Sequence, residues 1–169
     1  MPSVERVVHR LDVPSGQSYA ELRQRFEEAV PAYDVQLFAG LVADRVEWSA
    51  IVEATDRLAT YGFLRYWTVE AGPVMSLAGN TLACVSYLVG NHTIAQRMYR
   101  HDPGVMLYAP LRVAIHEDAD RRAWLSLDRP SDQFGSFGLP DVAAVGGELD
   151  GKVAALLRHL DLPAPPELG

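Results

Sequence analysis

Residues 105–127, Val-Met-Leu-Tyr-Ala-Pro-Leu-Arg-Val-Ala-Ile-His-Glu-Asp-Ala-Asp-Arg-Arg-Ala-Trp-Leu-Ser-Leu, carry the pattern that decides the fold. The odd positions from Val105 to Ile115 are all apolar and the even positions are mixed, a polar turn covers 118–122, and a largely apolar run returns over 123–127. Such alternation is typical of strands with one buried face, and a short polar turn joins antiparallel strands. The pattern predicts a β-hairpin whose first strand spans 105–117 and bends at Pro110, because proline has no N–H for pairing.

The remaining segments alternate between strand-like and helix-like patterns. Ser18 and Glu21 have the spacing of a capping box, which supports a helix from Ser18 to Pro31. Other helices are expected over 34–43, 47–58, 91–100 and 141–160, and other strands over 4–13, 62–70 and 82–89. This order indicates an α+β fold with a single mixed, largely antiparallel sheet, helices packed on one face, and an inserted helical pair within residues 31–60.

Length and charge restrict the classes of protein. The chain has 169 residues, of which 49% are hydrophobic, so it can bury one core. We expect a single domain over residues 1–162 and a flexible, proline-rich tail over 163–169. The net charge of −7, from 15 basic and 22 acidic residues, argues against a nucleic-acid or membrane partner, because both attract basic surfaces.

The cysteine content and the first residues bear on the compartment. Cys84 is the single cysteine and cannot form an internal disulfide, which favours a reducing environment. Residues 1–10 lack the apolar run of a secretory leader, and no stretch is long and apolar enough for a membrane span. We therefore expect a cytoplasmic protein.

Several short motifs resemble those of the bacterial family called domain of unknown function 302. They are Gly90-Asn91, His101-Asp102-Pro103, Tyr108-Ala109-Pro110-Leu111-Arg112-Val113 and Glu117-Asp118. The resemblance extends over about residues 4–160, and residues 31–60 resemble the longer, actinobacterial-type members. Many members have Asn-Pro where this chain has Asn91-His92. The resemblance implies a compact α+β fold and a homodimer, but it transfers no catalytic residue, because the family has no settled activity.

Side chains that can bind or react gather in residues 90–118. On the predicted long strand, Tyr108, Arg112 and His116 share one face, which is either solvated or lines a cleft that holds an anionic or carbonyl group. Tyr66 and Asn91 complete the candidate ligand-binding set. His92 and His101, at the two ends of a short predicted helix, are the candidate catalytic bases.

No recognised motif identifies the chemistry. His92 and His101 are nine positions apart, which fits no metal-binding spacing, so no cofactor is predicted. Haem or zinc remains an alternative, because His, Tyr and Met side chains would suit a haem pocket. His101 at a helix end equally fits a role in stabilising that end.

Three hypotheses from different classes follow. The first is a small-molecule-binding domain with a pocket between the sheet and the inserted helices. The second is a cofactor-independent enzyme of the isomerase, cyclase or hydrolase type that acts on a carbonyl-containing metabolite, with His92 or His101 as base and Arg112 and Tyr108 as oxyanion donors. The third is a structural or regulatory homodimer. A cavity lined by Arg112 and one of these histidines would favour the first two.

Overall fold

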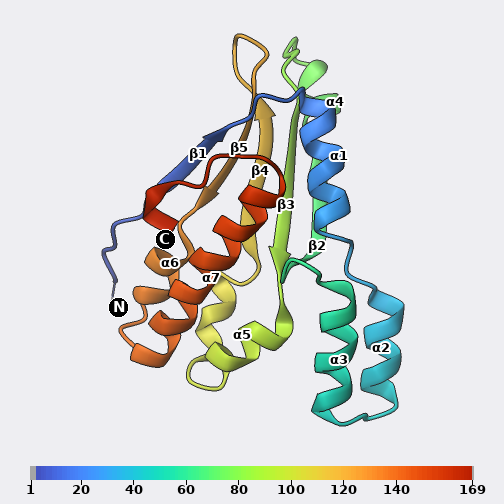
Figure 1. Ribbon diagram of the computed structural model, residues 1–169, viewed down its shortest axis with the longest axis vertical. Helices are drawn as coiled ribbons and strands as arrows, with labels where there is room; N and C mark the ends of the chain where they lie inside the picture. The colour runs from blue at the N-terminus through green and yellow to red at the C-terminus, as the bar shows by residue number, and fades with distance from the viewer. Residues whose placement is uncertain (1–2, 169) are drawn as a thin grey trace.

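A five-stranded sheet in the order β1-β5-β4-β3-β2 forms the centre of the computed structural model, which describes residues 3–168 (Figure 1). Neighbouring strands are antiparallel throughout this sheet. The strands are β1 (Arg10–Pro14), β2 (Leu64–Glu70), β3 (Cys84–Gly90), β4 (Leu111–Glu117) and β5 (Ala123–Asp128). The predicted α+β class and the β4–β5 hairpin are confirmed.

Helices cover one face of the sheet and extend the fold beyond one end of it. Helices α1 (Tyr19–Ala29) and α7 (Pro140–His159) lie over the covered face, while α2 (Val35–Ala43) and α3 (Trp48–Leu58) form the predicted inserted pair next to α5 (His92–Tyr99) (Figure 1). The shorter helices are α4 (Gly72–Ser76), α6 (Pro130–Gly135) and the 3-10 turns η1 (Pro103–Leu107) and η2 (Pro166–Leu168). Within residues 3–168, no helix is long and apolar enough to cross a membrane.

Strand β4 shows how alternation divides the two faces. Leu111, Val113 and Ile115 are buried in the main core with Phe26 of α1. Burial of each such side chain contributes about 1.5–3 kcal/mol. Arg112, between them in sequence, is exposed on the face that α1 and α7 leave open. The predicted inward and outward positions are therefore confirmed for residues 111–117.

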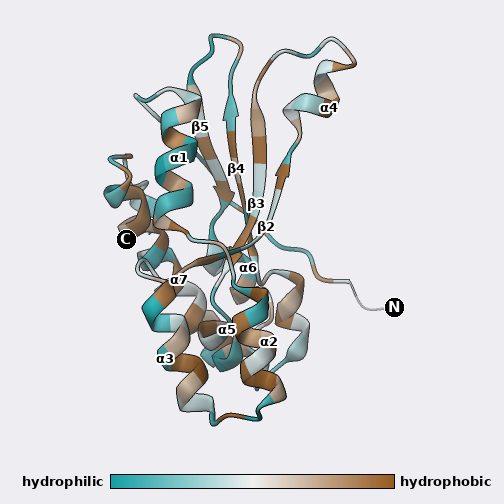
Figure 2. Cartoon of the chain, turned by 90° about the vertical axis from the view of Figure 1, so that its right-hand side faces the viewer, coloured by the Kyte–Doolittle hydropathy of each residue, from teal (hydrophilic) through white to brown (hydrophobic). Residues whose placement is uncertain are grey.

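The inserted helices have a small core of their own. Figure 2 shows apolar residues along α2 and α3. Phe38, Ala54 and Ala59 are buried in a second cluster together with Leu64 of β2. The α2–α3 pair is thus attached to the edge strand of the sheet through this cluster and not through the main core.

The prediction of a strand over 105–117 is wrong for its first half. Residues 103–107 form η1, and β4 begins after Pro110. The side chain of Asp102 accepts a hydrogen bond from the Gly104 N–H at 2.7 Å, and Pro103 follows at the first position of the turn, where its missing N–H costs nothing. The apolar residues 105–107 are compatible with a strand by residue type alone, but the Asp-Pro-Gly start favours a turn, which leaves Leu107 exposed.

Other boundaries also differ from the prediction. Strand β1 begins at Arg10 and not at residue 4, and Val4 and Val7 are exposed. The short helices α4 and α6 were not predicted. The proline-rich end, expected to be flexible, contains η2, and Leu168 is 2% exposed because it packs in the main core.

Two adjacent glycines of α7 provide a matched test of this packing. A Cβ atom at Gly146 would lie 3.1 Å from Phe134 Cβ and 3.2 Å from Ser131 Cα, whereas one at Gly147 would meet nothing within 4 Å. Alanine is favoured over glycine inside helices by about 1 kcal/mol. We expect Gly147→Ala to raise the free energy of unfolding by about 0.5–1 kcal/mol and Gly146→Ala to lower it, because α6 blocks the added methyl group.

Urea denaturation followed by circular dichroism measures both changes. If both variants are stabilised, α6 and α7 are not in the close contact described here.

Candidate functional site

A cavity of about 170 Å³ lies at the end of the sheet where β3 finishes and β2 and β4 begin. Its other walls come from α5, η1, α6 and α7. Most of its lining is apolar and includes Phe63, Ile94, Met98, Leu111 and Phe134. Three lining residues carry polar side chains, namely Tyr66, Asn91 and His92, and all three were predicted as site residues.

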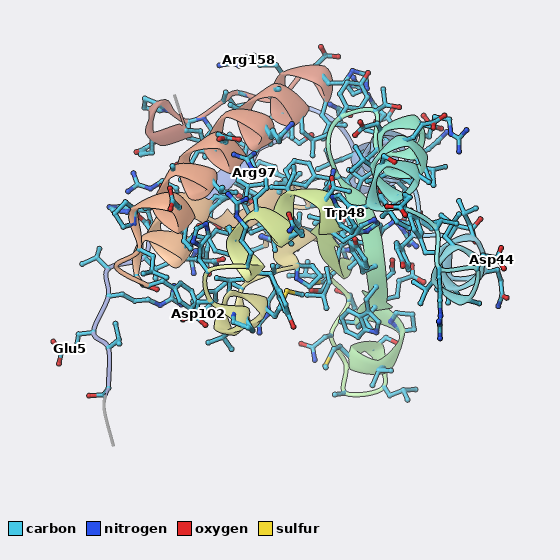
Figure 3. The ribbon with its side chains drawn as sticks, turned by 90° about the horizontal axis from the view of Figure 1, so that it is seen from below. Glu5, Asp44, Trp48, Arg97, Asp102 and Arg158 are labelled. Carbon is cyan, nitrogen blue, oxygen red and sulfur yellow. The ribbon has the colours of Figure 1, made fainter. Side chains whose placement is uncertain are left out.

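Helix α5 forms one wall and is held between two parts of the molecule. Viewed from below, α5 with its labelled Arg97 lies between α7 on one side and the α2–α3 pair, with Trp48 and Asp44, on the other (Figure 3). Arg97 forms a two-point ion pair with Glu148 of α7, with N–O distances of 2.6 and 2.7 Å. The opposite attachment is made by His92.

Asn91 fixes the start of α5. Its side-chain oxygen accepts hydrogen bonds from the Thr93 N–H at 2.9 Å, the Ile94 N–H at 3.3 Å and the Thr93 hydroxyl at 2.7 Å. Its amide nitrogen donates to the Gly62 carbonyl at 3.2 Å. Asn91 is therefore a buried helix cap that also ties α5 to the segment before β2.

His92 joins the cavity wall to the inserted helices through both ring nitrogens. Nε2 lies 2.8 Å from Thr55 Oγ1, and Nδ1 lies 2.8 Å from the Tyr66 hydroxyl oxygen. Thr55 donates its only hydroxyl hydrogen to the Ile51 carbonyl at 2.7 Å, so it can only accept from His92. The hydrogen-bond pattern therefore assigns the proton to Nε2, and Nδ1 accepts from Tyr66.

Burial keeps this pair uncharged near neutral pH. Desolvation lowers the pKa of His92 below its ordinary value of 6.5 and raises the pKa of Tyr66 to about 12. Neither hydrogen-bond partner of His92 is a carboxylate that would stabilise an imidazolium. The rings of Phe38 and Tyr33 approach the imidazole edge-on, with centroid distances of 4.7 and 5.9 Å, and add to its desolvation.

The other predicted side chains lie elsewhere. His101 is exposed after α5, with Nε2 3.7 Å from an Asp141 oxygen. Tyr108 packs edge-on against Phe134 and Phe137, and the Arg6 guanidinium lies 4.3 Å from its ring centroid.

Arg112 and His116 occupy the open face of the sheet. Arg112 is exposed and forms no ion pair with any residue in 3–168. His116 Nε2 lies 3.0 Å from Ser126 Oγ, which donates to Asp12 at 2.6 Å. The structure thus brings Tyr66, Asn91 and His92 together and does not join the other candidates to them. Tyr108 is separated from Arg112 because residues 103–107 turn and do not extend.

Two contributors to the site escaped the sequence analysis. Thr55 was not noticed because it lies in an amphipathic helix, where a lone threonine has no distinguishing pattern. Tyr33 stacks on both Phe38 and Tyr66, with centroid distances of 4.7 and 4.6 Å. Across the described chain, 3–168, no three His, Cys, Asp or Glu side chains are grouped to hold a metal ion.

Comparison with known proteins establishes the family. A family model described as "Domain of unknown function DUF302" matches residues 50–160. The chain belongs to the DUF302 family. The matched segment contains every residue that lines the cavity and also Thr55, so the site lies within the DUF302 region, whereas β1, α1 and α2 lie before it.

The fold of this DUF302 protein also has a solved counterpart. The crystal structure of an uncharacterized conserved protein DUF302 from Bacillus stearothermophilus is similar, with a TM-score of 0.61 and 16% sequence identity. The similarity covers 90% of this chain and 97% of the other. At this identity the likeness concerns the fold alone. None of the curated proteins matches the sequence.

The lowered pKa of His92 leads to a prediction about stability. Below about pH 6.5 the unfolded chain protonates His92 more than the folded chain does, so the free energy of unfolding falls as the pH falls. We expect this decrease, measured by urea denaturation between about pH 7.5 and about pH 5.5, to be smaller in His92→Gln than in the wild type. Parallel pH profiles would show that the imidazole is not shielded from protonation.

Proposed function

We propose that this domain binds a small, predominantly apolar molecule in the cavity beside α5. The observation that carries the proposal is the cavity itself, because mostly apolar side chains line a partly open space of about 170 Å³. Apolar cavities of about 150 Å³ in other proteins accept benzene. A ligand of about the size of one substituted ring therefore suits this space.

The position of the cavity differs from the predicted pocket between the sheet and the inserted helices. All its lining residues lie between Phe63 and Leu149, so none of the inserted residues 31–60 lines it. The inserted helices support the wall from behind, because Thr55 holds the imidazole of His92. The pocket is therefore bounded by the end of the sheet and α5, with the insertion as its outer support.

Binding is better supported than catalysis. The enzyme hypothesis placed Arg112 and Tyr108 beside a histidine base, yet Arg112 is on the open face of the sheet and Tyr108 packs on α6. His92 has a lowered pKa and uses both nitrogens in hydrogen bonds within the protein. These features favour a role for His92 as a neutral part of the cavity wall and not as a proton acceptor.

Neighbouring positions of α5 allow a matched test. Ala95 lines the cavity, whereas Gln96 is exposed. We expect toluene to bind to the wild type and to Gln96→Leu with similar affinity, and to bind at least about ten-fold more weakly to Ala95→Leu, because the larger side chain fills the cavity.

Isothermal titration calorimetry gives the affinities, and backbone amide NMR shifts locate the probe. Circular dichroism checks that both variants are folded. Absence of toluene binding to the wild type, or binding that Ala95→Leu leaves intact, would contradict the proposal.

A further inference from the structure

We infer that Met106 is the residue past which ligands enter the cavity, and that its side chain limits the length of the ligand that the cavity holds. The inference rests on the proposed function and adds how the site is reached and which ligands fit it. Its basis is the exposure of each lining residue to solvent.

Met106 lies where the cavity meets the solvent. It lines the cavity and is 48% exposed, whereas the other lining residues, all within 63–149, are buried or half-buried. A side chain that borders both a cavity and the solvent stands at the opening between them. Met98 provides the contrast, because it also lines the cavity but is only 1% exposed and so belongs to the interior.

The half-buried lining residues form the rest of the rim. They are Tyr66, Gly90, His92, Ala95 and Pro110. Glycine has no side chain, alanine has a single methyl group and proline is a closed ring, so none of these three can swing aside. The two larger residues, Tyr66 and His92, are held by their mutual hydrogen bond at 2.8 Å. Met106 is unbranched and has three rotatable side-chain bonds, so it is the rim residue that can move.

The backbone around Met106 is fixed, so the opening changes through the side chain. Val105 is buried in the main core and anchors η1. The Asp102 side chain accepts from the Gly104 N–H at 2.7 Å, and the Tyr108 N–H donates to the Val105 carbonyl at 3.0 Å. A ligand longer than the cavity has to extend through the opening, and there it meets the Met106 side chain.

Alanine variants of two neighbouring residues test the length limit. Leu107 belongs to the same turn and is 72% exposed, but it does not line the cavity. Propylbenzene has two more CH₂ groups than toluene, and each buried CH₂ group strengthens binding by about four-fold. We expect the ratio of propylbenzene affinity to toluene affinity, measured by calorimetry, to rise about ten-fold in Met106→Ala and to keep its wild-type value in Leu107→Ala.

The rate of binding tests the entry path separately from the affinity. Exchange spectroscopy by NMR gives the dissociation rate of toluene, and division by the dissociation constant gives the association rate. Where an opening limits access, its width sets the rate, so we expect the association rate to rise about ten-fold in Met106→Ala and to fall below the wild-type value in Met106→Trp. The matched variants Leu107→Ala and Leu107→Trp are expected to bind toluene at the wild-type rate.

The outcomes separate the two proposals. If toluene does not bind to the wild type, the proposed function fails. If toluene binds but Met106→Ala matches Leu107→Ala in either the affinity ratio or the association rate, the cavity binds ligands and the role inferred for Met106 is wrong. Both alanine variants shorten side chains that are exposed in the folded protein, and circular dichroism checks that they are folded.

Discussion

The buried amide of Asn91 is the interaction on which the arrangement of the cavity depends. It caps α5 with its oxygen and holds the Gly62 carbonyl with its nitrogen, so one side chain sets the position of a helix relative to an edge strand. Loss of such a cap costs about 1 kcal/mol in other helices, and here the bridge to Gly62 would be lost as well. His92 is the first residue of α5, so the position that Asn91 gives to the start of this helix also places the imidazole.

His92 links the inserted helices to the cavity wall, because its ring contacts Thr55 of α3. The small cluster around Phe38 attaches the α2–α3 pair to Leu64. The only polar side-chain bond from α3 to α5 within residues 3–168 is that of Thr55 with His92. A short insertion can therefore control the proton position of a residue in the cavity wall without lining the cavity.

Much of the fold could be predicted because its patterns are local. The capping box of Ser18 and Glu21 is present, and the alternation over 111–127 correctly separates the core face from the open face. Residues 105–110 were predicted wrongly, because alternation placed Leu107 inside with Val105 and Ala109, whereas the turn of η1 leaves Leu107 72% exposed. Tyr66 and His92 were identified by residue type, but their common partner Thr55 was not, because it is 37 positions from His92 and only tertiary packing joins them.

The unfilled space is best understood as a consequence of side-chain size. Elsewhere the core is filled by large buried side chains such as Phe26 and Tyr87, as close packing requires. Around the cavity, Gly90 does not adopt the left-handed backbone conformation that favours glycine, and a Cβ atom there would meet Pro110 Cα at 3.4 Å and Tyr66 Cε2 at 3.7 Å, both ordinary contacts. Backbone geometry therefore does not demand glycine at this position. Gly90 and Ala95, which carry no side chain and a single methyl group, both line the cavity, so the space is open where the chain has little side-chain volume.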